Sequence, residues 1–194
     1  AGLNPQSRIM ALKVADFQGQ TNSVAISRAI FFAVDNGAKV INISYGGPAS
    51  THIERRAIDY ATTHGVLVVV AAGNQGSDVT LSGLTDHPAV LVVAGSTTDD
   101  HRAAFSNWGE QVDLSAPAVN VLGLRARGSD FLRFNSEQSN YQPRRGFVGA
   151  DLYRATGTSF AAPLVSGTAS LLWSMQPDLT LTQVRQMLIM SADD

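Results

Sequence analysis

The run Gly157-Thr158-Ser159-Phe160-Ala161-Ala162-Pro163 places a serine hydroxyl at the start of a predicted helix. Behind it, apolar residues recur at helical spacing as far as Met175, and Pro163 falls in the first turn, where its missing N–H costs little. The positive end of a helix dipole favours negative charge that develops there. Ser159 is therefore a candidate nucleophile for acyl transfer, which requires a neighbouring base. The alternative is a plain helix start, because Thr and Ser often cap the first free N–H groups.

Asn74 follows the uninterrupted apolar segment Val66 to Ala72 and lies in the turn Gly73-Asn74-Gln75-Gly76. Ligands of open parallel sheets bind beyond the carboxyl ends of the strands. An asparagine at this position can aim its side-chain N–H at the oxyanion that forms when a serine attacks a carbonyl. A turn residue that tolerates a left-handed conformation is the alternative. Taken together with the Ser159 run, the pattern favours Asn74 as an oxyanion donor.

A second predicted strand end, Ile43-Ser44-Tyr45-Gly46-Gly47-Pro48, finishes in small residues. Such residues leave backbone N–H and C=O groups open, and an extended peptide can pair with them as an additional strand. We therefore expect Ser44, Tyr45 and Gly46 to bind a peptide. A simple turn at the end of the strand is the alternative.

These segments resemble motifs of the subtilisin-like serine proteases, the subtilase family (peptidase family S8). The Gly157–Pro163 run resembles the family's nucleophile motif, and Ala71-Ala72-Gly73-Asn74 matches its Ala-Ala-Gly-Asn segment. Ser44-Tyr45-Gly46 is similar to its Ser-Leu-Gly, with Tyr45 in place of Leu. Phe105–Gly109 and Asp113–Pro117 are further matches, so the resemblance covers nearly the whole chain in the family's order.

The resemblance implies a serine endopeptidase acting on peptides or proteins, with Ser159 as nucleophile. It implies that Asn74 and the Ser159 N–H are the oxyanion donors. The substrate-binding residues that it implies are Ser44, Tyr45, Gly46, Ala71, Ala72 and Gly73. Calcium is allowed by the resemblance, with ligands unknown, and no other cofactor is evident. A secreted or otherwise extracytoplasmic location is also implied.

The family's other catalytic motifs, Asp-(Ser/Thr)-Gly and His-Gly-Thr, do not occur in the sequence. No histidine follows Ser159, which excludes an α/β-hydrolase. The four histidines are interpreted as structural or surface residues: His52, His64, His87 and His101. We therefore expect the C-terminal two-thirds of a catalytic domain, with the triad Asp and His on a segment absent from this chain. The isolated chain is expected to be inactive.

Two functions stay open at this point. One is the serine endopeptidase just described; the other is a catalytically dead subtilase-like module that binds peptides or proteins through the Ser44–Gly46 edge. In the family, the strand that carries the catalytic Asp lies between the counterparts of Arg8–Val14 and Lys39–Tyr45. Without it the sheet is incomplete. We expect a companion chain, a second copy or rearranged pairing to complete it, unless the chain was cut after the histidine helix.

The remaining composition fits one α/β domain. The chain has 194 residues, 44% hydrophobic and 15% charged, enough to bury a sheet on both faces. Predicted strands alternate with predicted helices, which indicates a doubly wound, mostly parallel sheet. The strands are Arg8–Val14, Lys39–Tyr45, Val66–Ala72, Val90–Ala94 and Val112–Ser115, and the helices are Ser23–Asn36, Thr51–His64, Ser159–Met175 and Thr182–Ser191.

Residues 1–194 are thus predicted to be one partial peptidase domain with an arginine-rich insertion at about 124–155. The insertion is interpreted as an irregular solvated loop, as a border of the leaving-group side of the cleft, or as a segment that is clipped near Arg144-Arg145. The net charge of −2 argues against nucleic acid or an anionic membrane as partner, and no apolar stretch is long enough to span a bilayer. The absence of cysteine excludes disulfides and thiolate metal sites.

Overall fold

A parallel sheet of four strands, in the order β1-β2-β3-β4, forms the centre of the computed structural model. The structure describes residues 2–47, 49–81, 83–125 and 146–193. The strands are β1 (Val40–Ile43), β2 (Leu67–Ala71), β3 (Leu91–Ser96) and β4 (Leu114–Pro117). In register, Val40 lies opposite Leu67, and Val93 lies opposite Leu114. The prediction of an α/β fold with a mostly parallel sheet is confirmed, and the carboxyl ends of all these strands lie at one edge.

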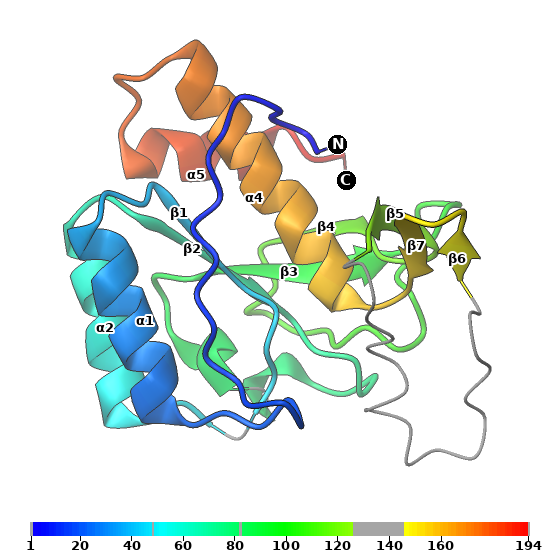
Figure 1. Cartoon of the computed structure of the whole chain (residues 1–194), viewed down its shortest axis with the longest axis horizontal. Helices are drawn as coiled ribbons and strands as arrows, with labels where there is room; N and C mark the ends of the chain where they lie inside the picture. The colour runs from blue at the N-terminus through cyan, green and yellow to red at the C-terminus, as the bar shows by residue number, and fades with distance from the viewer. Residues whose placement is uncertain (1, 48, 82, 126–145, 194) are drawn as a thin grey trace.

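Helices cover both faces of the sheet, so β2 is buried along its whole length. They are α1 (Ser23–Asp35), α2 (His52–Thr63), α4 (Thr158–Met175) and α5 (Leu181–Met190). Val68 and Val70 share an apolar core with α1 and α2. Leu67 and Val69 face a separate core with α4 and α5, because successive side chains of a strand point to opposite faces. Figure 1 shows α4 crossing in front of the strands.

The predicted helices form within a residue or two of their predicted ends, and local signals explain where they begin. Asn22 caps α1 by accepting a hydrogen bond from the Ala25 N–H. Thr51 and Glu54 form a reciprocal capping box at the start of α2. After α1 and α2, Gly37 and Gly65 adopt positive φ angles of 79° and 73°, which end each helix.

The predicted strand Arg8–Val14 is wrong. The segment forms no strand, and Ile9 is 90% exposed. A strand needs a neighbour to take its backbone hydrogen bonds, and among the described residues β1 pairs only with β2. The N-terminal segment instead begins against α4, where the Asn4 side chain donates to the hydroxyls of Ser170 and Ser174.

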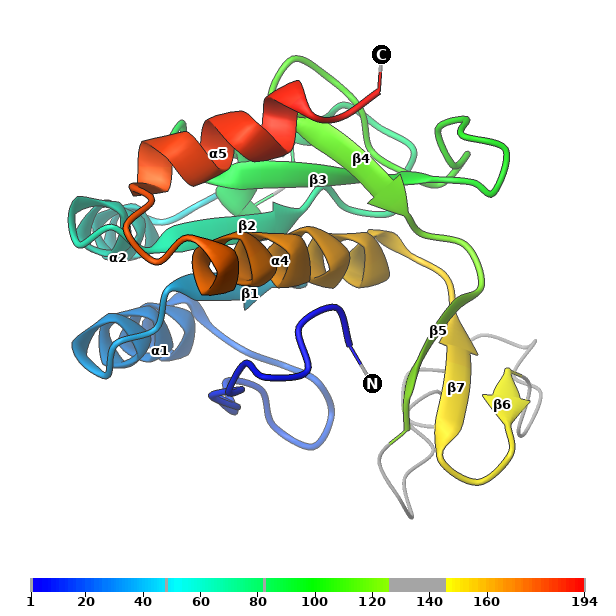
Figure 2. The same cartoon turned by 90° about the horizontal axis from the view of Figure 1, so that it is seen from above.

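A small antiparallel sheet, in the order β5-β7-β6, stands beside the main one, as Figure 2 shows. Its strands are β5 (Val121–Leu124), β6 (Phe147–Val148) and β7 (Leu152–Ala155), and the Arg125 guanidinium lies 4.1 Å from the centre of the Phe147 ring. The predicted insertion at about 124–155 overlaps this sheet. Its described end is therefore β structure rather than an irregular loop, and residues 126–145 lie outside the described residues.

Candidate active site

Ser159 lies half-buried in the first turn of α4, beside the carboxyl end of β1. Its hydroxyl donates to the carbonyl oxygen of Ser44, with 3.4 Å between the oxygens. In return, the Ser44 hydroxyl donates to the carbonyl oxygen of Ser159 at 2.9 Å. The structure therefore brings together two predicted site residues that are 115 positions apart in the sequence.

Asn74 lies just beyond β2, and its side-chain oxygen is held by Thr158, the residue that precedes Ser159. The Thr158 N–H donates to Asn74 Oδ1 at 2.8 Å, and the Thr158 hydroxyl donates to the same oxygen at 2.9 Å. That hydroxyl also accepts the N–H of Gly73 at 3.2 Å. Because Oδ1 is fixed by these bonds, the orientation of the amide group is fixed as well.

Two N–H donors near the start of α4 have no hydrogen-bond partner that the described residues supply. Asn74 Nδ2 has no hydrogen-bond partner among the described residues, and its side chain is exposed. The Ser159 N–H belongs to the first turn of α4, where backbone donors have no partner within the helix. Fixed N–H groups that converge on one point can stabilise the negative oxygen formed when a hydroxyl attacks a carbonyl.

No histidine supplies a base to Ser159 within the part of the chain that the structure describes. His52 and His64 lie at the two ends of α2, on the opposite face of the sheet from α4. His87 is buried; its Nε2 lies 3.2 Å from Asp59 Oδ1 on α2, and its Nδ1 accepts the Ala89 N–H. The contacts of His64 and His87 involve no atom of Ser159. The interpretation of all four histidines, His101 included, as structural or surface residues stays a prediction.

The other predicted substrate-binding residues differ in their exposure. The Tyr45 ring lies over Gly47, where an added Cβ would come within 3.0 Å of the tyrosine oxygen, whereas a Cβ added to Gly46 would meet open space. Ala71 and Ala72 are buried in the two cores and support the loop that follows them. Substrate binding stays a prediction for Ser44, Tyr45, Gly46, Ala71, Ala72 and Gly73.

The loop after Asn74 carries further polar contacts. Asp78 accepts from the hydroxyl and the N–H of Thr80, and these bonds lower the pKa of the Asp78 carboxyl. Asn107 is fully buried beneath this loop and bonds to it on both sides of Asn74. Thr158 and Asn107 were not predicted as supporting residues, although both lie in segments that resemble the family's motifs.

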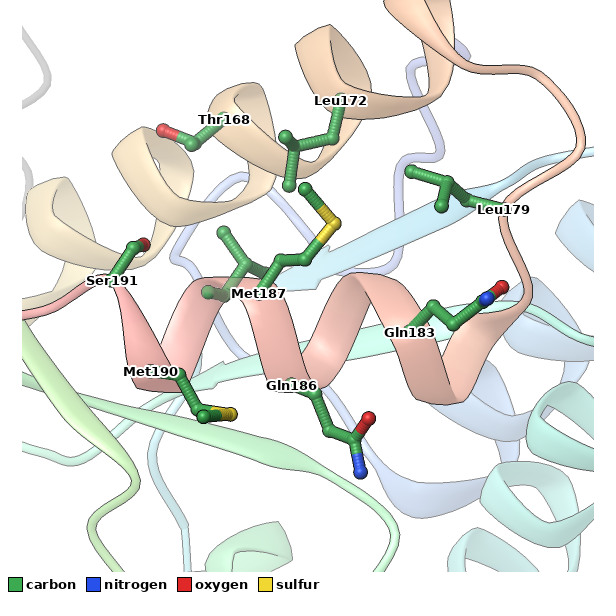
Figure 3. A pocket seen from close by; sticks show the side chains of 9 residues that line it. Thr168, Leu172, Leu179, Gln183, Gln186, Met187, Met190 and Ser191 are labelled. Carbon is green, nitrogen blue, oxygen red and sulfur yellow. The ribbon is translucent and has the colours of Figure 1, made fainter.

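Within the described ranges, no three His, Asp or Glu side chains cluster into a metal site. A groove of about 600 Å³ lies between α4 and α5. Figure 3 shows Leu172 and Met187 pointing toward one another across it. None of the predicted site residues lines this groove, so it is separate from Ser159. None of the described helices has the length and apolar character needed to cross a membrane.

Comparison with known proteins gives a consistent result. A model of the subtilase family matches residues 1–194. The chain is 32% identical over 194 residues to subtilisin DY from Bacillus licheniformis, an alignment that covers 98% of the chain and 63% of that protein. It is 33% identical over 193 residues to the thermophilic serine proteinase of Bacillus sp. strain AK1, covering all of the chain and 42% of that protein.

Solved structures of proteases superpose on the chain. A lanthipeptide protease superposes with a TM-score of 0.83 at 26% identity, covering 99% of this chain and 65% of that one. The prenylagaramide maturation protease PagA superposes with a TM-score of 0.75 at 30% identity, covering 92% of this chain and 60% of that one. The chain thus spans less than two thirds of the length of these relatives. Its fold and its match to the family model along residues 1–194 show that the chain belongs to the subtilase family.

Proposed function

We propose that this chain forms the nucleophile-bearing part of a serine endopeptidase. One observation carries the proposal: Thr158 holds Asn74 Oδ1 at the start of α4, which leaves Asn74 Nδ2 without a partner among the described residues, and the Ser159 N–H lies in the first turn of the same helix. The substrate is a peptide or protein whose backbone extends along Ser44–Gly46. Relatives that are themselves proteases, among them subtilisin DY and a lanthipeptide protease, support this substrate class.

In this mechanism Ser159 Oγ forms a bond to the carbonyl carbon of the scissile peptide. The carbonyl oxygen becomes negative and accepts hydrogen bonds from Asn74 Nδ2 and the Ser159 N–H. The carbon–nitrogen bond then breaks, and the proton lost by Ser159 passes through a base to the leaving amine. Water hydrolyses the resulting acyl-enzyme, which restores the Ser159 hydroxyl and releases the second product.

We assign the base and the acid that orients it, a histidine and an aspartate, to a segment outside these 194 residues. The side-chain contacts of His64 and His87 support this assignment, since none of them involves Ser159. The isolated chain is then inactive apart from a residual acceleration of about 10³–10⁴ over water, a value measured in subtilisin and not worked out from this structure.

The outer edge of β1 is a place where that segment can pair with the sheet. Among the described residues it has no strand partner, so its backbone can pair with an extended segment from the same protein, a companion chain or a second copy. A secreted or otherwise extracytoplasmic location is part of the same proposal and follows from the family alone. Calcium stays a prediction without assigned ligands.

The second candidate function is a catalytically inactive module that binds peptides through the Ser44–Gly46 edge. It is favoured by one contact: the Ser159 hydroxyl donates to the Ser44 carbonyl oxygen and not to a base. In this case the strand end and the loop at Asn74 serve recognition only.

Labelling with a serine-directed fluorophosphonate tests the two functions. We expect rapid stoichiometric labelling of Ser159 in the full protein, and little labelling of residues 1–194 alone, because the chemistry needs a base. Ser159→Ala is the control that identifies the labelled residue. A full protein that shows neither labelling nor cleavage of a peptide library, yet binds peptides, would establish the inactive module instead.

A further inference from the structure

Asn107 is an uncharged polar side chain with no solvent exposure, in the Phe105–Gly109 segment to which the proposed reaction gives no role. Its Oδ1 accepts from the N–H groups of Gln75 at 3.0 Å and Ser77 at 3.1 Å. Its Nδ2 donates to the carbonyl oxygen of Ala72 at 2.9 Å and to Gln75 Oε1 at 3.1 Å. Buried amides need such partners, so this side chain is held in a single orientation.

These contacts lie on both sides of Asn74. Ala72 precedes it by two residues, and Gln75 follows it directly. Gln75 Oε1, which accepts from Asn107, also accepts the backbone N–H of Asn74 at 3.0 Å. The Asn107 side chain therefore fixes the backbone on both sides of Asn74. It also fixes Gln75 Oε1, which accepts the backbone N–H of Asn74.

The backbone around Asn107 extends the same contact. The Asn107 N–H donates to the Gly73 carbonyl oxygen at 3.0 Å, and the Gly76 N–H donates to the Phe105 carbonyl oxygen at 2.8 Å. The Trp108 N–H donates to the carbonyl oxygen of Ser77 at 3.1 Å. The loop is thus bonded to this segment at successive peptide groups and has little freedom to move as a whole.

We infer that Asn107 is a positioning residue for the oxyanion site: it holds the backbone of the Asn74 loop, while Thr158 holds the Asn74 side chain. This inference rests on the proposed function in giving Asn74 the part of oxyanion donor. Both anchors are needed, because Thr158 fixes the amide oxygen but does not fix the path of the chain that carries it. Small misplacements of such donors have large effects on turnover.

Asn107→Asp separates the acceptor bonds of the Asn107 side chain from its donor bonds. The ionised carboxylate keeps the acceptor for Gln75 and Ser77 but faces two oxygen atoms, where Asn107 had donors. We expect kcat of the full protein on a peptide substrate to fall about 10–100-fold with KM nearly unchanged. A protonated Asp can donate one of the lost bonds. The ratio of variant to wild-type kcat is therefore expected to rise as the pH falls.

Asn107→Leu removes every side-chain hydrogen bond of this residue. Amide hydrogen exchange measured on the same full protein is expected to lose about tenfold or more of its protection at Gln75 and Ser77 in this variant. Asn22→Ala, which removes the cap of α1 on the other face of the sheet, is the control: it lowers stability without changing kcat per folded molecule or exchange at the loop.

Two outcomes would overturn the inference. One is an Asn107→Asp protein whose kcat per folded molecule and pH profile equal those of the wild type. The other is unchanged protection at Gln75 and Ser77 in an Asn107→Leu protein that folds. If that variant does not fold, amide exchange is measured in Asn107→Asp, which keeps the acceptor but strains the loop. Failure of the proposed function would look different, because the wild-type protein would be inactive and unlabelled. The hydrogen-exchange comparison would still decide whether Asn107 holds the Asn74 loop.

Discussion

The contact between Arg185 on α5 and Asp113 before β4 allows a sharp prediction about stability. Arg185 Nη2 lies 2.7 Å from Asp113 Oδ1, and Arg185 Nη1 donates to the carbonyl oxygens of Val90 at 2.7 Å and Ala89 at 3.3 Å. The other carboxylate oxygen of Asp113 accepts the Val92 N–H at 2.7 Å. One pair of side chains therefore ties α5 to the two strands β3 and β4. The perturbation is Arg185→Met, which keeps the aliphatic stem and removes the charge.

The magnitude follows from the exposure of the pair, whose side chains are 27% and 17% exposed. Breaking a fully buried pair costs about 3–5 kcal/mol, and an exposed pair contributes about 0–1 kcal/mol. Asp113 keeps its bond from Val92 and is within reach of water, so we place the loss between these limits, at about 2–3 kcal/mol. For a chain of this size the midpoint of thermal unfolding falls by about 4–12 °C.

Urea unfolding measures the loss. Trp173 is a suitable fluorescent probe, because it is 8% exposed and its Nε1 donates to the Leu179 carbonyl oxygen in the connection between α4 and α5. We expect the midpoint of unfolding to fall while its slope stays constant.

Arg55→Met is the matched control. It breaks an ion pair of similar length, 2.8 Å to Asp86, whose side chains are 40% and 34% exposed. We expect a loss of about 1 kcal/mol or less. If Arg185→Met costs no more than Arg55→Met, burial does not decide the strength of these pairs and the reasoning is refuted.

Three further predictions concern the candidate site. Asn74→Ala is expected to lower kcat of the full protein by roughly 10²–10³, a value measured in a subtilisin and not worked out from this structure; steady-state kinetics measures it, and an undiminished kcat contradicts the oxyanion role. Gly157→Ala is expected to cost about 1–3 kcal/mol, because Gly157 has a φ of 146° that other residues rarely adopt. An unchanged urea midpoint would count against this strain. Thr80→Val is expected to raise the pKa of Asp78 toward its ordinary value, as an NMR titration would show, and an unmoved pKa would assign the shift to another cause. Because the folded pKa lies below the unfolded one, Asp78 stabilises the wild type at neutral pH, and this contribution is lost as the pH falls through the folded pKa.

The buried helices and strands could be predicted from the sequence because their apolar patterns can be recognised without knowing which elements lie beside them. The apolar run Val66 to Ala72 has the composition of a strand covered on both faces, and β2 is such a strand. Arg8–Val14 has a similar pattern but forms no strand, because a strand also depends on a partner that the pattern cannot reveal. The sheet β5-β7-β6 escaped prediction because its strands are short and largely exposed, so they lack the continuously buried apolar pattern of β2.

The residues of the candidate site also differ in whether local sequence patterns could predict them. Ser159 and Asn74 could be proposed as site residues from their local motifs. Their supports could not, since Thr158 reaches Asn74 across 84 positions and Asn107 reaches Ala72 across 35. Such pairings depend on how the strands are ordered in the sheet, which no local pattern contains.

The alternation of β2 between two cores also has a consequence for insertions and deletions. Asn74 is the third residue after Ala71, the last of β2, so the length of this strand determines where Asn74 lies relative to Thr158. Removing one residue from β2 would exchange the side chains that face the two cores and displace Asn74 from its anchors. The exposed turn at Asp99 and Asp100 has no such role, and there we expect added residues to leave both cores intact. The tolerance to changes in length is therefore expected to differ between β2, which sets the position of Asn74, and this exposed turn.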